Sequence, residues 1–154
     1  MTKDEFYMGK ALAEAKTAYA VGEIPIGAVI VYEKKVVARA YNLRESLPCA
    51  TAHAELLAIE KACRALNRWR LTGCTLYVTV EPCPMCAGAV WAAQVGRVVF
   101  GAADPKAGAT GSLYNFAVDP RLNHQSEVVH GVGADEASAL LTAFFAARRQ
   151  STTP

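Results

Sequence analysis

The apolar positions at the start of the chain recur every three or four residues, as on one face of a helix. They are Met8, Leu12, Ala15 and Tyr19. Thr2 stands three residues before Glu5, the spacing of a capping box at a helix start, and Gly22 marks the end of the repeat. This pattern predicts an amphipathic first helix.

The pattern then changes to short β-type runs that alternate with helical ones. Residues 27–32 and 36–41 are two such runs, joined by charged residues 33–35, which predicts a hairpin. Thr51 is a suitable N-cap for a second helix over roughly 52–66. Further along, the sequence predicts strands at 75–80, 97–101 and 127–130, and helices at about 83–94 and 134–149.

Alternating strands and helices predict an α/β fold, a sheet with helices on both faces. The length of 154 residues fits one domain over residues 1–154. A hydrophobic fraction of 53% with 19% charged residues excludes general disorder.

Charge and hydropathy limit the cellular locations and binding partners that we expect for this protein. No apolar run approaches the roughly 20 residues that span a bilayer, and the charged opening residues are unlike a secretory leader, so we expect a cytoplasmic protein with no membrane partner. Sixteen Lys and Arg against fourteen Asp and Glu give a net charge of +2. This modest excess does not indicate a nucleic-acid partner, but it leaves binding through a local patch open.

Two of the five cysteines have the spacing of a chemical site. Cys83 and Cys86 stand three residues apart at a predicted helix start, where the helix dipole favours thiolates and both sulfurs reach one point. A soft metal and a thioredoxin-type redox pair both suit this spacing.

His53 favours the metal. Two thiolates and one imidazole make three ligands for tetrahedral zinc and leave the fourth position open. A purely structural zinc needs a fourth protein ligand, and none stands at a conventional short spacing. The candidates for it are Cys49, Cys63, Cys74, His124 and His130.

Glu55 follows His53 by two residues, so the two side chains diverge around a helix and Glu55 is not a ligand beside it. In a first turn, however, both side chains can bracket a water molecule at the open zinc position. Glu55 is then the base that takes the proton of that water, which attacks an electron-poor carbon such as an amidine carbon of a nucleobase.

His53-Ala-Glu55 followed by Pro82-Cys83-x-x-Cys86 resembles the signature of zinc-dependent nucleoside and base deaminases. Nearly the whole chain resembles the bacterial tRNA-specific adenosine deaminases, which convert the wobble adenosine of an anticodon to inosine. The segments that carry this resemblance are 51–55, 76–83, 85–88, 96–101 and 108–113.

The resemblance implies a three-layer α/β/α fold with a central mixed sheet of about five strands, as in cytidine deaminase-like proteins. It also implies one Zn²⁺ per chain held by His53, Cys83 and Cys86, with Glu55 as the catalytic residue that moves protons. The implied partners are a tRNA anticodon loop and a second copy of the chain in a homodimer.

Four further residues match RNA-contacting positions of this family: Asn42, Asp104, Phe144 and Arg148. Three of them also have a purely structural interpretation, since Asn42 and Asp104 suit turns and one of Phe144 and Phe145 suits core packing. Ala50 departs from the family pattern, in which a proline commonly precedes the Thr-Ala-His segment.

Three other functions compete with this prediction. The metal motif alone fits a deaminase of free guanine, cytosine or a nucleotide equally well. A zinc-stabilised RNA-binding module without turnover would keep the ligands but have no use for Glu55. A Cys-x-x-Cys redox protein would form a disulfide between Cys83 and Cys86 on mild oxidation.

Overall fold

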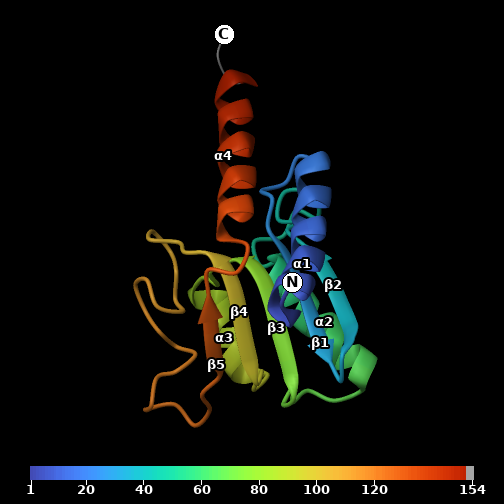
Figure 1. Cartoon of the computed structure of the whole chain (residues 1–154), viewed down its shortest axis with the longest axis vertical. Helices are drawn as coiled ribbons and strands as arrows, with labels where there is room; N and C mark the ends of the chain where they lie inside the picture. Colours follow the sequence, from blue (N-terminus) through green and yellow to red (C-terminus); the bar gives the residue numbers. More distant parts are fainter. Residues whose placement is uncertain (152–154) are drawn as a thin grey trace.

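The computed structural model describes residues 1–151, which form a five-stranded sheet and four helices (Figure 1). Among these residues, no helix has both the length and the apolar character needed to cross a membrane. The elements in chain order are α1 Lys3–Ala20, β1 Gly27–Tyr32, β2 Lys35–Tyr41, α2 Ala54–Leu66, β3 Cys74–Val80, α3 Pro84–Ala92, β4 Arg97–Ala102, β5 Glu127–His130 and α4 Ala134–Ser151.

The sheet has the strand order β2-β1-β3-β4-β5. β1 runs antiparallel to both of its neighbours, whereas β3, β4 and β5 run parallel to one another. Since α3 connects β3 to the parallel β4, the carboxyl ends of these strands meet at one edge, where α/β proteins commonly place their ligands. The prediction of a mixed sheet of about five strands is confirmed.

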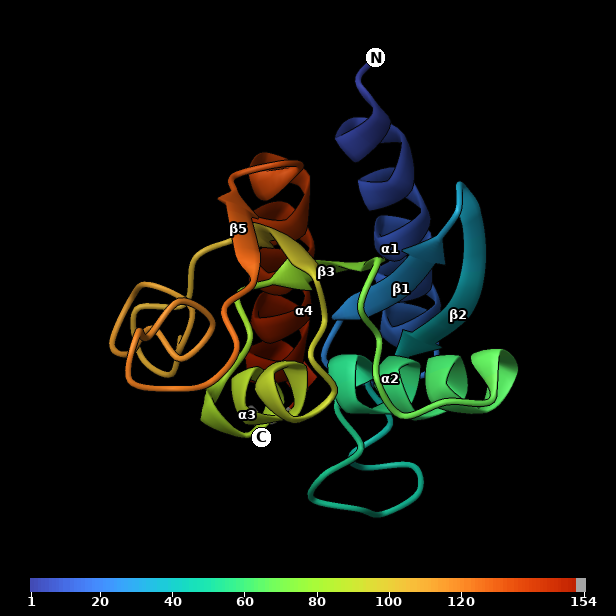
Figure 2. The same ribbon diagram turned by 90° about the horizontal axis from the view of Figure 1, so that it is seen from below.

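Alternate side chains of each central strand enter different cores, because successive residues of a strand point to opposite faces. Ile30, Leu76 and Val98 pack with α2 and α3 on one face. On the other face, Val29 and Tyr77 pack with α1 and α4. Figure 2 shows α2 and α3 below the sheet and α1 above it. The helices on both faces confirm the three-layer prediction.

The start of α1 is capped as the sequence predicts. Thr2 Oγ1 accepts a hydrogen bond from the backbone N–H of Glu5 at 3.1 Å, which satisfies one of the free N–H groups of the first turn. The hairpin between β1 and β2 is tighter than predicted. Glu33 and Lys34 form its turn with φ values of 49° and 65°, the left-handed conformation that suits the twist of a two-residue hairpin.

The starts of α2 and α3 differ from the sequence prediction. α2 begins at Ala54 with His53 as its N-cap, so Thr51 is not the cap; its hydroxyl lies 3.3 Å from Cys49 Sγ instead. Likewise, α3 begins at Pro84 with Cys83 as its N-cap, because a residue before proline is driven to extended backbone. His53 and Cys83 therefore both stand just outside a helix.

Candidate active site

Two helix N-termini bring three metal-binding side chains together. His53 precedes α2, Cys83 precedes α3, and Cys86 lies in the first turn of α3. The Nδ1 atom of His53 lies 3.6 Å from Cys83 Sγ and 3.5 Å from Cys86 Sγ. All three ligand atoms lie within 4.8 Å of one another, and no other His, Cys, Asp or Glu of the described residues joins this group.

These distances fit a tetrahedral zinc ion. With Zn–S of about 2.3 Å and Zn–N of about 2.05 Å, a tetrahedral angle separates N from S by about 3.6 Å. The observed separations match this value, so the three atoms are arranged around one metal position without rearrangement. With three protein ligands, one coordination position remains for water or substrate, as in catalytic rather than structural zinc sites.

The electrostatics of the group also suit a cation. Hydrogen bonds from Cys86 and His53 lower the pKa of Cys83 to about 4 despite its partial burial. The same hydrogen bond between His53 and Cys83 is the chief cause that raises the pKa of His53. The thiolate is the form of cysteine that binds a metal. Zinc binding would release the protons still held by the other two ligands, Cys86 and His53.

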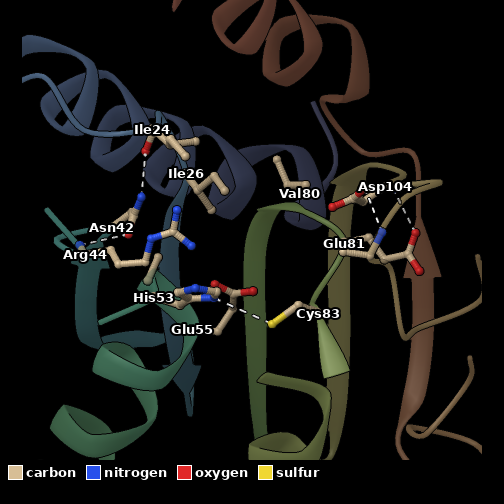
Figure 3. A pocket seen from close by; sticks show the side chains of 12 residues that line it. Ile24, Ile26, Asn42, Arg44, His53, Glu55, Val80, Glu81, Cys83 and Asp104 are labelled. Carbon is tan, nitrogen blue, oxygen red and sulfur yellow. Dashed lines mark hydrogen bonds between the residues drawn. The ribbon is translucent and has the colours of Figure 1, made fainter. Parts of the chain in front are cut away.

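Glu55 lies in the first turn of α2 and is almost completely buried, with 4% of its surface exposed. This burial raises the pKa of Glu55 to about 7, because a carboxylate loses hydration there. Figure 3 shows its carboxyl group beside His53 and facing Cys83. A carboxyl group with a pKa near the working pH can both accept and return a proton.

His53, Glu55 and Cys83 form the floor of a pocket with a volume of about 160 Å³. This volume is smaller than the roughly 300–1,000 Å³ of pockets for drug-sized ligands and suits one flat nucleobase. Ile24, Ile26 and Val80 give it apolar surface, against which a nucleobase can pack.

Asn42 and Asp104 line opposite sides of this pocket (Figure 3). Both side chains also make the local hydrogen bonds that are typical of turn residues. Asn42 Oδ1 accepts from Arg44 N at 3.1 Å, and Asp104 Oδ1 accepts from Lys106 N at 3.0 Å. The structure thus brings both residues to the pocket that contains Glu55, while their contact with RNA stays a prediction.

Phe144 and Arg148 lie on α4 and do not line the pocket. Phe144 is the buried member of its pair, 5% exposed against 42% for Phe145, and packs edge-to-face on Tyr19. The guanidinium of Arg148 lies 5.1 Å from the centre of the Phe144 ring. The predicted role of both residues in clamping RNA therefore concerns the surroundings of the pocket, not its interior.

Sequence reasoning missed three residues at or behind the pocket walls. Arg44 and Glu81 line the pocket, and Glu23 is buried behind the loop that carries Arg44. The available signal was a single acidic residue at the end of an apolar run, as in Val80-Glu81. Nothing in the sequence tells which loop such a carboxylate binds.

Comparison with known proteins assigns the chemistry of this arrangement. Residues 1–102 match the model of the cytidine and deoxycytidylate deaminase zinc-binding region. The chain is 57% identical over 145 residues to a tRNA-specific adenosine deaminase of Bacillus subtilis (strain 168), covering 94% of this chain and 90% of that protein. It is 45% identical to the tRNA-specific adenosine deaminase of Aquifex aeolicus (strain VF5), covering 92% and 93%.

Two solved structures of deaminases have a fold similar to that of this chain. A chain from a study of A-to-I editing by tRNA:A34 deaminases at the wobble position of transfer RNA superposes with a TM-score of 0.85 at 43% identity, covering 88% of this chain and 99% of that one. A guanine deaminase from Nitrosomonas europaea superposes with a TM-score of 0.81 at 26% identity, covering 95% and 86%.

Proposed function

The chain belongs to the family of zinc-binding cytidine and deoxycytidylate deaminases, and from this premise we propose that it converts the wobble adenosine of a tRNA anticodon to inosine. It is a zinc-dependent hydrolytic deaminase. The observation that carries the proposal is the buried Glu55 carboxyl group beside a three-ligand zinc site, in a chain 57% identical to a tRNA-specific adenosine deaminase.

Zinc, if held by His53, Cys83 and Cys86, would supply a Lewis acid that lowers the pKa of water and so makes a hydroxide nucleophile available at neutral pH. Glu55 accepts one proton of the attacking water as its oxygen forms a bond to C6, and delivers that proton to the ring nitrogen N1 of adenine. Glu55 then passes the second proton to the amino group, and the C6–N bond breaks. Adenosine and water become inosine and ammonia, and Glu55 ends in its starting state.

The pocket also explains how one base of an RNA loop is selected. The floor and walls accept a single base, so the target base has to leave its stack, at a cost of a few kcal/mol that is smaller in a loop than in a duplex. Asn42 and Asp104 contact the flipped nucleotide and its neighbours, while Phe144 and Arg148 position the loop from α4.

We further propose that the protein acts as a homodimer in the cytoplasm. Exposed apolar side chains support a second copy, since Trp91, Leu113 and Tyr114 expose between 37% and 55% of their surface and large exposed apolar groups are typical of interfaces. Sedimentation of the zinc-loaded protein tests this assembly, and a monomer at micromolar concentration would refute it.

A deaminase of free bases is the second candidate, because the guanine deaminase structure shares the fold over most of the chain. The zinc-loaded protein is incubated with a synthetic anticodon stem-loop carrying adenosine at the wobble position, and separately with free guanine, cytosine and cytidine. A stem-loop with guanosine at that position is the control. We expect inosine in the adenosine stem-loop alone, and ammonia release from free bases alone would overturn the proposal.

A further inference from the structure

The two walls of the pocket are each attached to a buried carboxylate that the reaction itself does not use. Glu23, between α1 and β1, is 1% exposed, and Glu81, directly after β3, is 3% exposed. Acidic side chains are almost never buried to this degree unless they are paired. Each of the two accepts hydrogen bonds from a neighbouring loop.

Glu23 binds the loop that follows β2. Its Oε1 accepts from the backbone N–H of Glu45 at 3.2 Å, and its Oε2 accepts from the N–H of Ser46 at 2.6 Å and from the Ser46 hydroxyl at 2.5 Å. Although burial raises it, these hydrogen bonds and the charge of Arg148 leave the pKa of Glu23 below its usual value. The loop held in this way carries Asn42 and Arg44.

Glu81 binds the loop that follows β4 in the same manner. Its Oε1 accepts from the N–H of Asp104 at 3.0 Å and from the Ser112 hydroxyl, and its Oε2 accepts from the N–H groups of Thr110 and Ser112, each at 3.0 Å. The loop held in this way carries Asp104, which lies on the side of the pocket opposite Asn42 (Figure 3), and Ala107, which also lines the pocket.

The two carboxylates therefore use the same contacts, backbone N–H groups and one serine hydroxyl, on facing loops of one pocket. We propose that Glu23 and Glu81 are positioning residues that fix the two walls and thereby set the affinity for the nucleotide between them. For the identity of that nucleotide, the inference rests on the proposed function.

The physical reason is that a carboxylate accepts hydrogen bonds on both oxygens, whereas a glutamine side chain accepts on one and presents N–H donors at the other. In a Gln variant at either position, a loop N–H or the serine hydroxyl would face another donor. The loop would lose its hydrogen bonds to that end of the side chain, although the Glu and Gln side chains have nearly the same volume. Since the walls contact the substrate before the reaction as well as during it, a loosened wall chiefly raises KM.

The test compares Glu23→Gln, Glu81→Gln and the control Asp4→Asn. Asp4 also accepts three hydrogen bonds, one from Tyr77 and two from Arg97, but at the start of α1 and β4, away from the pocket. Four measurements are made on each variant: amide hydrogen exchange by NMR, zinc per chain, Tm, and the kinetic constants kcat and KM on the adenosine stem-loop.

For Glu23→Gln we expect exchange at Glu45 and Ser46 to accelerate at least 10-fold while Asp104, Thr110 and Ser112 stay protected. Glu81→Gln should show the reverse pattern. Each should raise KM about 10-fold, the loss expected when hydrogen bonds to a charged group fail. Asp4→Asn should lower Tm by as much as the two Gln variants do, but should leave KM within 2-fold of wild type.

Equal exchange changes at both loops, or a KM change no larger than that of Asp4→Asn at the same loss of Tm, would overturn the proposal. Should a Gln variant fail to fold, Ser46→Ala and Ser112→Ala each remove one bond of the same sets and should show smaller changes with the same loop specificity. If the wild-type chain leaves the stem-loop unchanged, the proposed function fails, while the exchange pattern still decides whether the carboxylates hold the walls.

Discussion

Gly108 offers a steric test of the wall held by Glu81. A Cβ atom added at Gly108 would lie 2.5 Å from Oε1 of Glu81 and closer still to its Cδ and Oε2. These are the last atoms of a side chain, which elsewhere could swing aside. Here the carboxylate is buried and held by four hydrogen bonds, so Gly108→Ala forces either the loop or the carboxylate out of place.

The size of the effect follows from that distance. Non-bonded carbon atoms rest at about 3.5–4.0 Å, so the added methyl group has to separate from the carboxylate by about 1 Å. A displacement of this size at groups that position a substrate costs about 100-fold in rate. We therefore expect kcat/KM on the stem-loop to fall about 100-fold in Gly108→Ala.

The assay measures inosine formation together with zinc per chain and Tm. Gly9→Ala is the matched control, because Gly9 lies within α1 and an added Cβ meets no atom within 4 Å. Alanine at a helix position stabilises by about 0.5–1 kcal/mol relative to glycine, so this control should keep full activity and a slightly raised Tm.

A Gly108→Ala protein with kcat/KM within 3-fold of wild type would refute the reasoning, since the wall would then tolerate displacement of the carboxylate. Loss of zinc in this variant would also refute the reasoning, for a second reason. It would show that the clash is transmitted to Cys83, two residues after Glu81, and that the metal site rather than the wall explains the lost activity.

Three further predictions concern the metal site, the proton carrier and the stability of the fold. Glu55→Gln should lower kcat at least 100-fold yet keep one zinc per chain by elemental analysis, and retained turnover would remove Glu55 from the mechanism. Cys83→Ser should lose zinc because a neutral hydroxyl replaces a thiolate, and full metal occupancy would contradict the ligand set. Asp4→Asn should destabilise by about 2 kcal/mol at pH 7 in urea unfolding, since it removes hydrogen bonds between charged groups. The hydrogen bonds from Arg97 lower the pKa of Asp4 from 3.8, so wild type has this stabilisation above pH 3.8 and loses it as the pH falls through the lower folded value. The difference between Asp4→Asn and wild type should therefore shrink at pH 3, and an unchanged difference there would contradict the assignment.

The sequence by itself determined the local features of this protein. The three- to four-residue repeat before Gly22 predicted α1, the β-branched runs predicted the strands, and Thr2 with Glu5 predicted a cap that the structure confirms. The spacing of Cys83 and Cys86 with His53 also predicted the metal group. These features depend on residues near in sequence or on ligand chemistry, so a linear pattern contains them.

Tertiary structure alone decided the start of α2, where the backbone turn before His53 made it the N-cap in place of Thr51. It also separated the two neighbouring phenylalanines, since only contact with Tyr19 from α1 tells that Phe144 is buried. Glu23 and Glu81 acquire their partners from loops 22 to 31 residues further along the chain. A carboxylate can bind any free N–H group, and the fold decides which loop brings one to it.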